Sequence, residues 1–422
     1  METTKIFQYS DLTWPEVAAV RRDTPLVIPL GEGYPGEQLS SMLGNPPQIG
    51  LLPPLPYGWR GSALSVPDAC LGVLLDNLMD SLRDDGFTRV YVLTPPGIEL
   101  GSGSQAVRAS HLRLRTTPSH PSPPAPGNTV PVSSRENTRS VPMLLPPDSD
   151  RDKVVLVCTG HTEQHAYHLP LSTDTLIIDA ICQGTAAAIA KQAVALPAFP
   201  YGVSTHRSSF AGTTSCGGRA YEDFWLAVIE TLVLRGFNRF FFMNGHGGNT
   251  SFLHNVVKYA GERHQHIFCA TAYLYLSASQ GVAALEQHRQ SKIGGMGHAC
   301  ELETSFILHL RQDLVHMERV VDETDFIATP SYYMDWTEGG ALTANPPWDD
   351  DTATGAYGAG SLGTAEKGEL WLAAAIAEKV ALVNEIHEQY RLRMQRRNTP
   401  GVFPGGHRDG VARSRKVKNS SL

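Results

Sequence analysis

Residues 153–174 read KVVLVCTGHTEQHAYHLPLSTD, and this stretch decides how the second half of the chain is expected to fold. Val154–Cys158 is a short run rich in β-branched residues, which is typical of a strand buried on both faces. A polar segment follows, and apolar residues then recur at helical spacing over Asp174–Ala193. A buried strand that leads through a polar turn into a helix is the start of a parallel α/β unit.

The same alternation of strand and helix patterns continues toward the C-terminus. Strands are expected at Arg239–Met243 and Ile267–Tyr275, and helices at Tyr221–Arg235, Thr250–Arg263 and Gly368–Gln395. This order predicts a mainly parallel sheet with helices on both faces. Sites in such sheets form at the carboxyl ends of the strands, and the polar clusters of this chain fall there.

Composition excludes several classes of protein. Of the 422 residues 41% are hydrophobic, which is enough to build a packed core and excludes global disorder. The net charge of −7 argues against a nucleic-acid partner. No apolar run approaches the ~20 residues of a membrane-spanning helix, and the first residues do not resemble a secretory signal. Six cysteines scattered singly are typical of reduced thiols in a cytoplasmic protein.

Proline and charge divide the chain into four segments. Residues 1–115 and 151–395 have the pattern of globular units. Residues 116–150 are rich in Pro and Ser, which predicts an extended linker. Residues 396–422 carry many Arg and Lys side chains and are expected to form a disordered basic tail.

Two polar clusters follow expected strands. Glu163 and His165 are two residues apart and point the same way from an extended loop, and Asp174 follows where a helix should begin. The alternative for Asp174 is a helix N-cap, and His161 is expected to form hydrogen bonds within its loop. His246 lies in the glycine-rich turn 244–249. A phosphate-binding turn is the alternative there, but the Lys-Ser/Thr pair of a P-loop is missing.

The third cluster spans residues 297–305. If a helix begins there, His298 and Glu301 share one face, whereas Glu303 lies about 200° around the axis from Glu301. We therefore expect Glu301 to face the site, and Glu303 to be solvated or to contact a metal-binding residue without binding the metal itself. If the helix begins later, the roles of Glu301 and Glu303 would be exchanged. The three clusters supply oxygen and nitrogen donors for two metals that share a ligand, which suits Zn²⁺, Mn²⁺ or Fe²⁺.

Four segments, in order, resemble the signatures of the creatininase (creatinine amidohydrolase) family. They are Thr162–His165 with His168–Asp174, Pro200–Ser204 with Phe210–Ser215, Asn244–Asn249, and His298–Glu301 with Glu303–Ser305. The resemblance implies a creatininase-like three-layer sandwich around a mainly parallel sheet. It also implies two divalent metal ions, Zn²⁺ first with Mn²⁺ or Fe²⁺ as alternatives, and hydrolysis of non-peptide C–N bonds.

The resemblance also implies a ligand set. Glu163 and His246 would hold one metal, His165 and a glutamate the other, and Asp174 would bridge the two. In creatininase proper that glutamate follows the histidine of the third signature; here Gly248 occupies the position, so Glu301 is the expected replacement. His298 and Glu303 are then the candidate catalytic residues, with His298 as the acid that protonates the leaving nitrogen.

The aromatic loop Ser331–Gly358 is expected to cover a small ring-shaped substrate. Tyr332 and Trp336 in this loop, together with Ser215, are the candidate substrate-binding residues. The alternative for the loop is a contact between subunits.

Residues 1–115 resemble a degenerate creatininase-like half-repeat. Pro56-Tyr57-Gly58 parallels Pro200-Tyr201-Gly202, and Gly86–Arg89 parallels Gly236–Arg239. In this register the residues opposite Glu163, His165 and His246 are Tyr34, Gly36 and Pro96, none of which can bind a metal. The alternative is a single domain interrupted by the proline-rich segment.

These observations predict a dinuclear metal-dependent amidohydrolase that cleaves a small, cyclic amide through a hydroxide held between the metals. One alternative is a metal-dependent hydrolase that opens a cyclic polyol ketone at a C–C bond. Another is a non-enzymatic binding or assembly protein. The expected partners are a small-molecule substrate and further copies of the chain, hexamer-like by family resemblance, and neither nucleic acid nor a membrane.

Overall fold

The computed structural model describes residues 4–95, 100, 111–113, 144–205, 209–337 and 339–399. Pro96 and most of the expected linker and basic tail lie outside these residues. The strands form two parallel sheets and one short antiparallel pair. The strands are β1 (Lys5–Gln8), β2 (Leu26–Pro29), β3 (Gln48–Leu51), β4 (Val90–Thr94), β5 (His111–Arg113), β6 (Val154–Thr159), β7 (Ala193–Ala195), β8 (Arg239–Asn244), β9 (Phe268–Ala272), β10 (Met296–His298) and β11 (Tyr357–Gly358).

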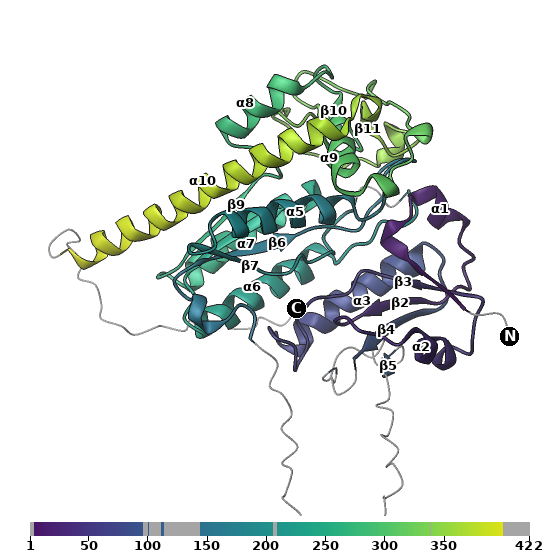
Figure 1. The fold of residues 1–422 in the computed structure, drawn as a ribbon, viewed down its shortest axis with the longest axis horizontal. Coiled ribbons are helices and arrows are strands. Elements are labelled where there is room, and N and C mark those ends of the chain that lie inside the picture. The colour runs from purple at the N-terminus through teal and green to yellow at the C-terminus, as the bar shows by residue number, and fades with distance from the viewer. Residues whose placement is uncertain are drawn as a thin grey trace, which may run out of the picture.

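The helices cover the sheets and fill the space between them (Figure 1). They are α1 (Trp14–Ala19), α2 (Gly36–Met42), α3 (Asp68–Asp84), α5 (Thr173–Ala188), α6 (Gly218–Leu234), α7 (Thr250–Arg263), α8 (Ser279–His288), α9 (Glu301–Arg311) and α10 (Ala365–Asn398). The expected α/β fold with parallel sheets is confirmed. None of the helices in the described part of the chain combines the length and apolarity needed to cross a membrane.

The sheet of the second half has the strand order β7-β6-β8-β9, and all neighbours are parallel. Strand β6 is buried along its whole length, and its side chains alternate between two cores. Val154 and Leu156 pack with α5 and α10 on one face, whereas Val155 and Val157 pack with α6 and α7 on the other. Burial on both faces explains why the sequence of this strand is continuously apolar.

The sheet of the first half repeats this arrangement. Its order is β1-β3-β2-β4-β5, so β3-β2-β4-β5 follows the same path as β7-β6-β8-β9, with one extra strand at the edge. Helices α3 and α6 pack against each other between the two sheets (Figure 1). One apolar core joins the halves, because Tyr57 lies 6.5 Å from Trp225 and 5.9 Å from Phe199, centroid to centroid. The shared strand order supports the proposed half-repeat, and the shared core makes the halves one packed body.

One helix ends earlier than its sequence pattern predicts. The pattern indicates a helix over Asp174–Ala193, but α5 ends at Ala188 and residues Ala193–Ala195 form β7. Alanine and lysine in this segment favour helix by intrinsic propensity. Pairing of Ala193 with Val154 at the sheet edge outweighs that preference, so tertiary structure decides the boundary.

A matched pair of leucines on α6 tests the shared core. Leu232 is fully buried in the core, and Leu234, two residues on, is 79% exposed. We expect Leu232→Ala to lower the free energy of unfolding by about 2–5 kcal/mol, because it removes buried methyl groups and leaves a cavity. Leu234→Ala should change it by about 0.5 kcal/mol or less. Urea denaturation followed by circular dichroism gives both values, and equal losses would contradict the core assignment.

Candidate metal centre

The centre is built on the loop between β6 and α5, in which alternate side chains point to opposite sides. Thr162 anchors the loop, since its hydroxyl donates to Pro200 O at 2.8 Å. Gln164 does the same, since its side-chain amide donates to Gly355 O at 2.9 Å. His161, Glu163 and His165 lie between and beside these anchors, and each belongs to a buried group able to hold a metal ion. The extended loop therefore directs every second side chain into the centre.

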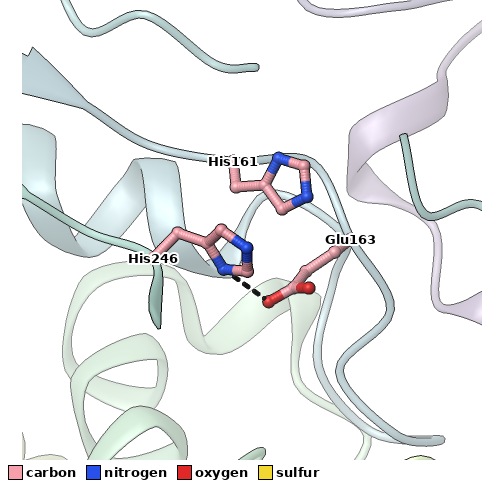
Figure 2. A group of neighbouring side chains, drawn as sticks. All are labelled: His161, Glu163 and His246. Atoms are coloured by element: carbon pink, nitrogen blue, oxygen red, sulfur yellow. Dashed lines mark ion pairs between the residues drawn. The ribbon is translucent and has the colours of Figure 1, made fainter. Parts of the chain in front are cut away.

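Asp174 lies between two histidines. It is the second residue of α5, and its Oδ1 is 3.3 Å from His165 Nε2 while its Oδ2 is 3.0 Å from His246 Nδ1. His246 follows β8 and also lies 2.9 Å from Glu163 Oε1 through the same Nδ1 atom (Figure 2). The structure thus brings Glu163, His165, Asp174 and His246 together. Asp174 occupies the position between the two halves of the cluster.

Glu303 completes the cluster, and Glu301 does not. The Oε1 atom of Glu303 lies 3.8 Å from His165 Nε2, and Glu303, His165 and Asp174 form one of the groups able to hold a metal. Glu301 points elsewhere: its carboxylate lies 2.6 Å from Lys367 Nζ and accepts a hydrogen bond from Gln290 N at 2.9 Å. This arrangement is the reverse of the one we expected from the sequence.

The reversal has a local cause. Residues Met296–His298 form strand β10, and α9 begins only at Glu301, with Cys300 as its N-cap. The helix therefore starts three to four residues later than the pattern suggested. Glu303 falls in the first turn, where its carboxylate accepts a hydrogen bond from Ala299 N at 2.6 Å. A carboxylate in the first turn of a helix is favoured by the helix dipole.

Gly248 occupies a position with no space for a side chain. A Cβ atom there would collide with the carbonyl oxygen of Val203 and with Nε2 of His246. Position 248 therefore cannot carry a carboxylate in this fold. Glu303, from α9, is the carboxylate that lies beside His165 instead.

Negative charge dominates the electrostatics of the centre. Burial lowers the pKa of His165, but the carboxylates of Asp174 and Glu303 outweigh burial and raise it to about 10. Burial also lowers the pKa of His246, but Glu163 and Asp174 raise it to about 9. Burial raises the pKa of Asp174, but the two histidines hold it well below its ordinary value. The carboxylates thus favour positive charge at both histidines.

His298 and His161 flank the cluster on opposite sides. The ring of His298 lies 4.1 Å from that of His165, and its Nε2 is 2.7 Å from the backbone oxygen of Gln164. Since a carbonyl only accepts, that nitrogen carries the proton, and Nδ1 is directed at Glu163 Oε1, 3.8 Å away. His161 accepts from Gly202 N at 2.9 Å and lies beside His246 (Figure 2). The sequence led us to expect only hydrogen bonds within the loop for His161, whereas the structure groups it with Glu163 and His246. Its alternation with Glu163 and His165 along the loop is the sequence signal that could have indicated this position.

The aromatic loop covers the centre with a different residue from those expected. Trp348 lies edge-on to His298, with ring centroids 5.0 Å apart. Trp336 instead stacks on Tyr275 in the core, and Tyr332 bridges to Thr329 within the loop. Ser215 lies against α3, where its backbone nitrogen donates to Ser81 Oγ at 2.9 Å. None of the contacts of Tyr332, Trp336 and Ser215 in the described structure reaches the cluster.

A family model matches this part of the chain. The model, described as "Creatininase: Creatinine amidohydrolase", covers residues 146–383, more than half of the sequence. The chain belongs to the creatininase family. Membership confirms the expectation of an enzyme, a hydrolase of this family, and the four signatures quoted from the sequence fall within the matched residues.

Individual relatives are more distant. Creatinine amidohydrolase from Pseudomonas putida is 30% identical over 185 residues, which are 40% of this chain and 69% of that protein. Mycofactocin precursor peptide peptidase from Mycolicibacterium smegmatis is 33% identical over 178 residues, 40% of this chain and 62% of the peptidase. A crystal structure of creatinine amidohydrolase (creatininase) is 26% identical, with a TM-score of 0.48 over 58% of this chain and 92% of that one. The chain thus spans about two thirds of the length of the two curated relatives.

The ion pair between Lys367 and Glu301 should be structural. Both side chains are buried, and removal of one partner leaves a buried charge. We expect Lys367→Met to lower the free energy of unfolding by about 3–5 kcal/mol. Glu301→Gln keeps the acceptor for the backbone, and the double variant should lose less than the sum of the two single changes. Denaturant unfolding of the four proteins measures this coupling, and strict additivity would mean that the pair does not interact.

Proposed function

We propose that this chain is a dinuclear metal-dependent hydrolase that cleaves the C–N bond of a small amide. The observation that carries the proposal is the position of Asp174, whose two oxygens face His165 and His246 at 3.3 and 3.0 Å. Glu163 lies on the His246 side and Glu303 on the His165 side. One metal would be held by Glu163, Asp174 and His246, and the other by His165, Asp174 and Glu303.

The donor set fits divalent cations. Three carboxylates are buried together, and within the described residues their partners in the cluster are histidines, not Lys or Arg. Buried carboxylates are costly without a cation. The atoms His165 Nε2 and Asp174 Oδ2 are buried and make no hydrogen bond of normal geometry, although His165 Nε2 lies 3.3 Å from Asp174 Oδ1 and Asp174 Oδ2 lies 3.0 Å from His246 Nδ1. Mixed imidazole and carboxylate donors suit Zn²⁺, Mn²⁺ or Fe²⁺.

The reaction requires both activation of water and a proton donor. When bound, such cations supply the Lewis acidity that polarises a carbonyl group and lowers the pKa of water toward neutrality. His298 is the residue suited to move a proton, since its Nδ1 is directed into the centre and its Nε2 is fixed by the backbone of Gln164. Its Nδ1 would first take a proton from the attacking water and then deliver that proton to the leaving nitrogen.

The protein encloses the reaction. Residues of the cluster are at most 3% exposed, and Trp348 from the covering loop lies edge-on to His298. Exclusion of bulk water strengthens the electrostatic interactions within the centre. The loop must move aside when substrate enters. The enclosed centre and aromatic cover favour a compact, ring-shaped amide over an extended chain.

Two further properties belong to this proposal. All six cysteines are free, which supports a cytoplasmic enzyme. Ile327, just before the covering loop, and Leu342, within it, are 66% and 61% exposed, which supports a homo-oligomer that buries them.

The metal content of variants at Glu303 and Glu301 tests the centre. We expect the purified protein to bind about two equivalents of Zn²⁺ or Mn²⁺, since the cluster offers two sets of donors. Glu303→Gln should lose at least one equivalent and nearly all hydrolysis, whereas Glu301→Gln, two residues away, should keep both equivalents. Glu163→Gln and His246→Ala should also lose metal. Plasma emission spectrometry after dialysis gives the stoichiometry.

A substrate panel completes the test. Cyclic amides, linear amides and a cyclic polyol ketone should be compared with the metal-loaded protein and with Glu303→Gln. Turnover of an amide that is lost in the variant supports C–N hydrolysis, whereas turnover of the ketone alone would replace it with C–C cleavage. Unchanged metal content in Glu163→Gln, His246→Ala and Glu303→Gln would remove the site.

A further inference from the structure

The N-terminal half offers none of the proposed ligands, yet one face of its helix α3 contacts the catalytic half closely. Asn77 and Ser81 on α3, and Asp85 directly after it, are spaced four residues apart and therefore lie along one side of the helix. All three side chains form hydrogen bonds with a single segment of the other half, residues 212–216. The contact is polar, although it adjoins the large apolar core between the sheets.

The hydrogen bonds follow the backbone of the segment in order. Asp85 accepts from Gly212 N at 2.7 Å. Ser81 Oγ accepts from Ser215 N at 2.9 Å and lies 3.1 Å from Ser215 O. Asn77 donates to Cys216 O at 2.6 Å. The helix therefore binds backbone atoms, which fixes the path of the segment whatever its side chains are.

The opposite side of this segment contacts the loop that carries Glu163. Thr214 N and its hydroxyl both lie 3.0 Å from Thr162 O, and Thr213 Oγ1 accepts from Gln164 N at 3.1 Å. The residues on either side of Glu163 are thus both held by residues 213–214. Glu163 in turn lies 2.9 Å from His246 in the centre.

A second set of backbone hydrogen bonds links the same loop to the N-terminal half. Leu171 N donates to Leu12 O at 2.9 Å, and Ser172 N donates to Ser10 O at 2.9 Å. Glu163 N donates to Leu171 O at 3.1 Å. The backbone of Glu163 is therefore tied to the N-terminal half through Leu171 as well as through residues 213–214.

We propose that the N-terminal half-repeat is a positioning scaffold for the metal centre, in which Asn77, Ser81 and Asp85 fix residues 212–216 and thereby the carboxylate of Glu163. This inference rests on the proposed function of the centre. Asn77, Ser81 and Asp85 are positioning residues, since none touches the cluster. A half that has no ligands of its own would thus be required for those of the other half to converge.

Ionisation of Asp85 is compatible with this role. Burial raises its pKa to about 6, while the hydrogen bond from Gly212 and the charge of Arg22 oppose burial, and Asp84 adds to the rise. Tyr9 also interacts electrostatically with Asp85. The carboxylate is therefore ionised at pH 8, where its hydrogen bond to Gly212 N is charge-assisted.

Metal affinity of the full-length protein is the decisive measurement. Zn²⁺ affinity and stoichiometry would be measured at pH 8 by competition with a chromophoric chelator, for the natural sequence and for Ser81→Ala, Asp85→Ala and their double variant. We expect the double variant to bind the weaker equivalent roughly tenfold less tightly, in the range found for residues that support metal ligands. Ser81→Thr and Asp85→Asn retain the hydroxyl and the acceptor and should stay within about threefold of the natural protein.

Two exposed positions provide matched controls. Asp80 lies on α3 with its side chain 64% exposed, and Ser41 lies exposed on α2. Asp80→Ala and Ser41→Ala should leave Zn²⁺ affinity unchanged. If circular dichroism shows that the double variant does not fold, the Zn²⁺ affinity of each single alanine variant is compared with that of its conservative variant, Ser81→Thr or Asp85→Asn.

The outcomes separate three possibilities. Weaker binding in the alanine variants, with recovery in Ser81→Thr and Asp85→Asn, supports positioning. A lower melting temperature with unchanged Zn²⁺ affinity in the folded protein means a structural role only and overturns the inference while the proposed function stands. Absence of Zn²⁺ and Mn²⁺ binding in the natural protein overturns both.

Discussion

The carboxylate of Asp174 between His165 and His246 is the interaction on which the rest of the centre depends. Each oxygen faces a different imidazole, so the side chain fixes the separation of the two halves of the cluster. Burying this charge is unfavourable unless positive charge is nearby. Glu163 and Glu303 add two more carboxylates, and together with the histidines the three acids form groups that could hold a metal ion.

The course of the backbone brings these side chains together. Strand β6 brings the loop to the carboxyl edge of the sheet, β8 brings His246 beside it, and the first turn of α5 brings Asp174. Glycines permit the close approaches. A Cβ at Gly160 would collide with Thr175, and one at Gly245 would lie 2.8 Å from the carbonyl oxygen of Asp174. The proposed ligands converge because β6 and β8 end, and α5 begins, at the same edge of the sheet.

The sequence allowed the fold class and four of the proposed ligands to be predicted, because strong local patterns determine both. Continuous apolar strands and short-range spacing are visible in one dimension, and Glu163, His165, Asp174 and His246 each follow such a pattern. The choice between Glu301 and Glu303 depended on where α9 begins, and helix starts are poorly defined by sequence. The place of Trp348 over His298 depends on the path of a loop that no periodic pattern specifies.

Gly248 limits which elements can place a carboxylate in the cluster. Where creatininase proper is expected to carry a glutamate, this chain has no space for any side chain, and Glu303 from another element lies beside His165. The N-terminal half has the same strand order but none of the proposed ligands, and a common core and the hydrogen bonds of α3 join it to the surroundings of the centre.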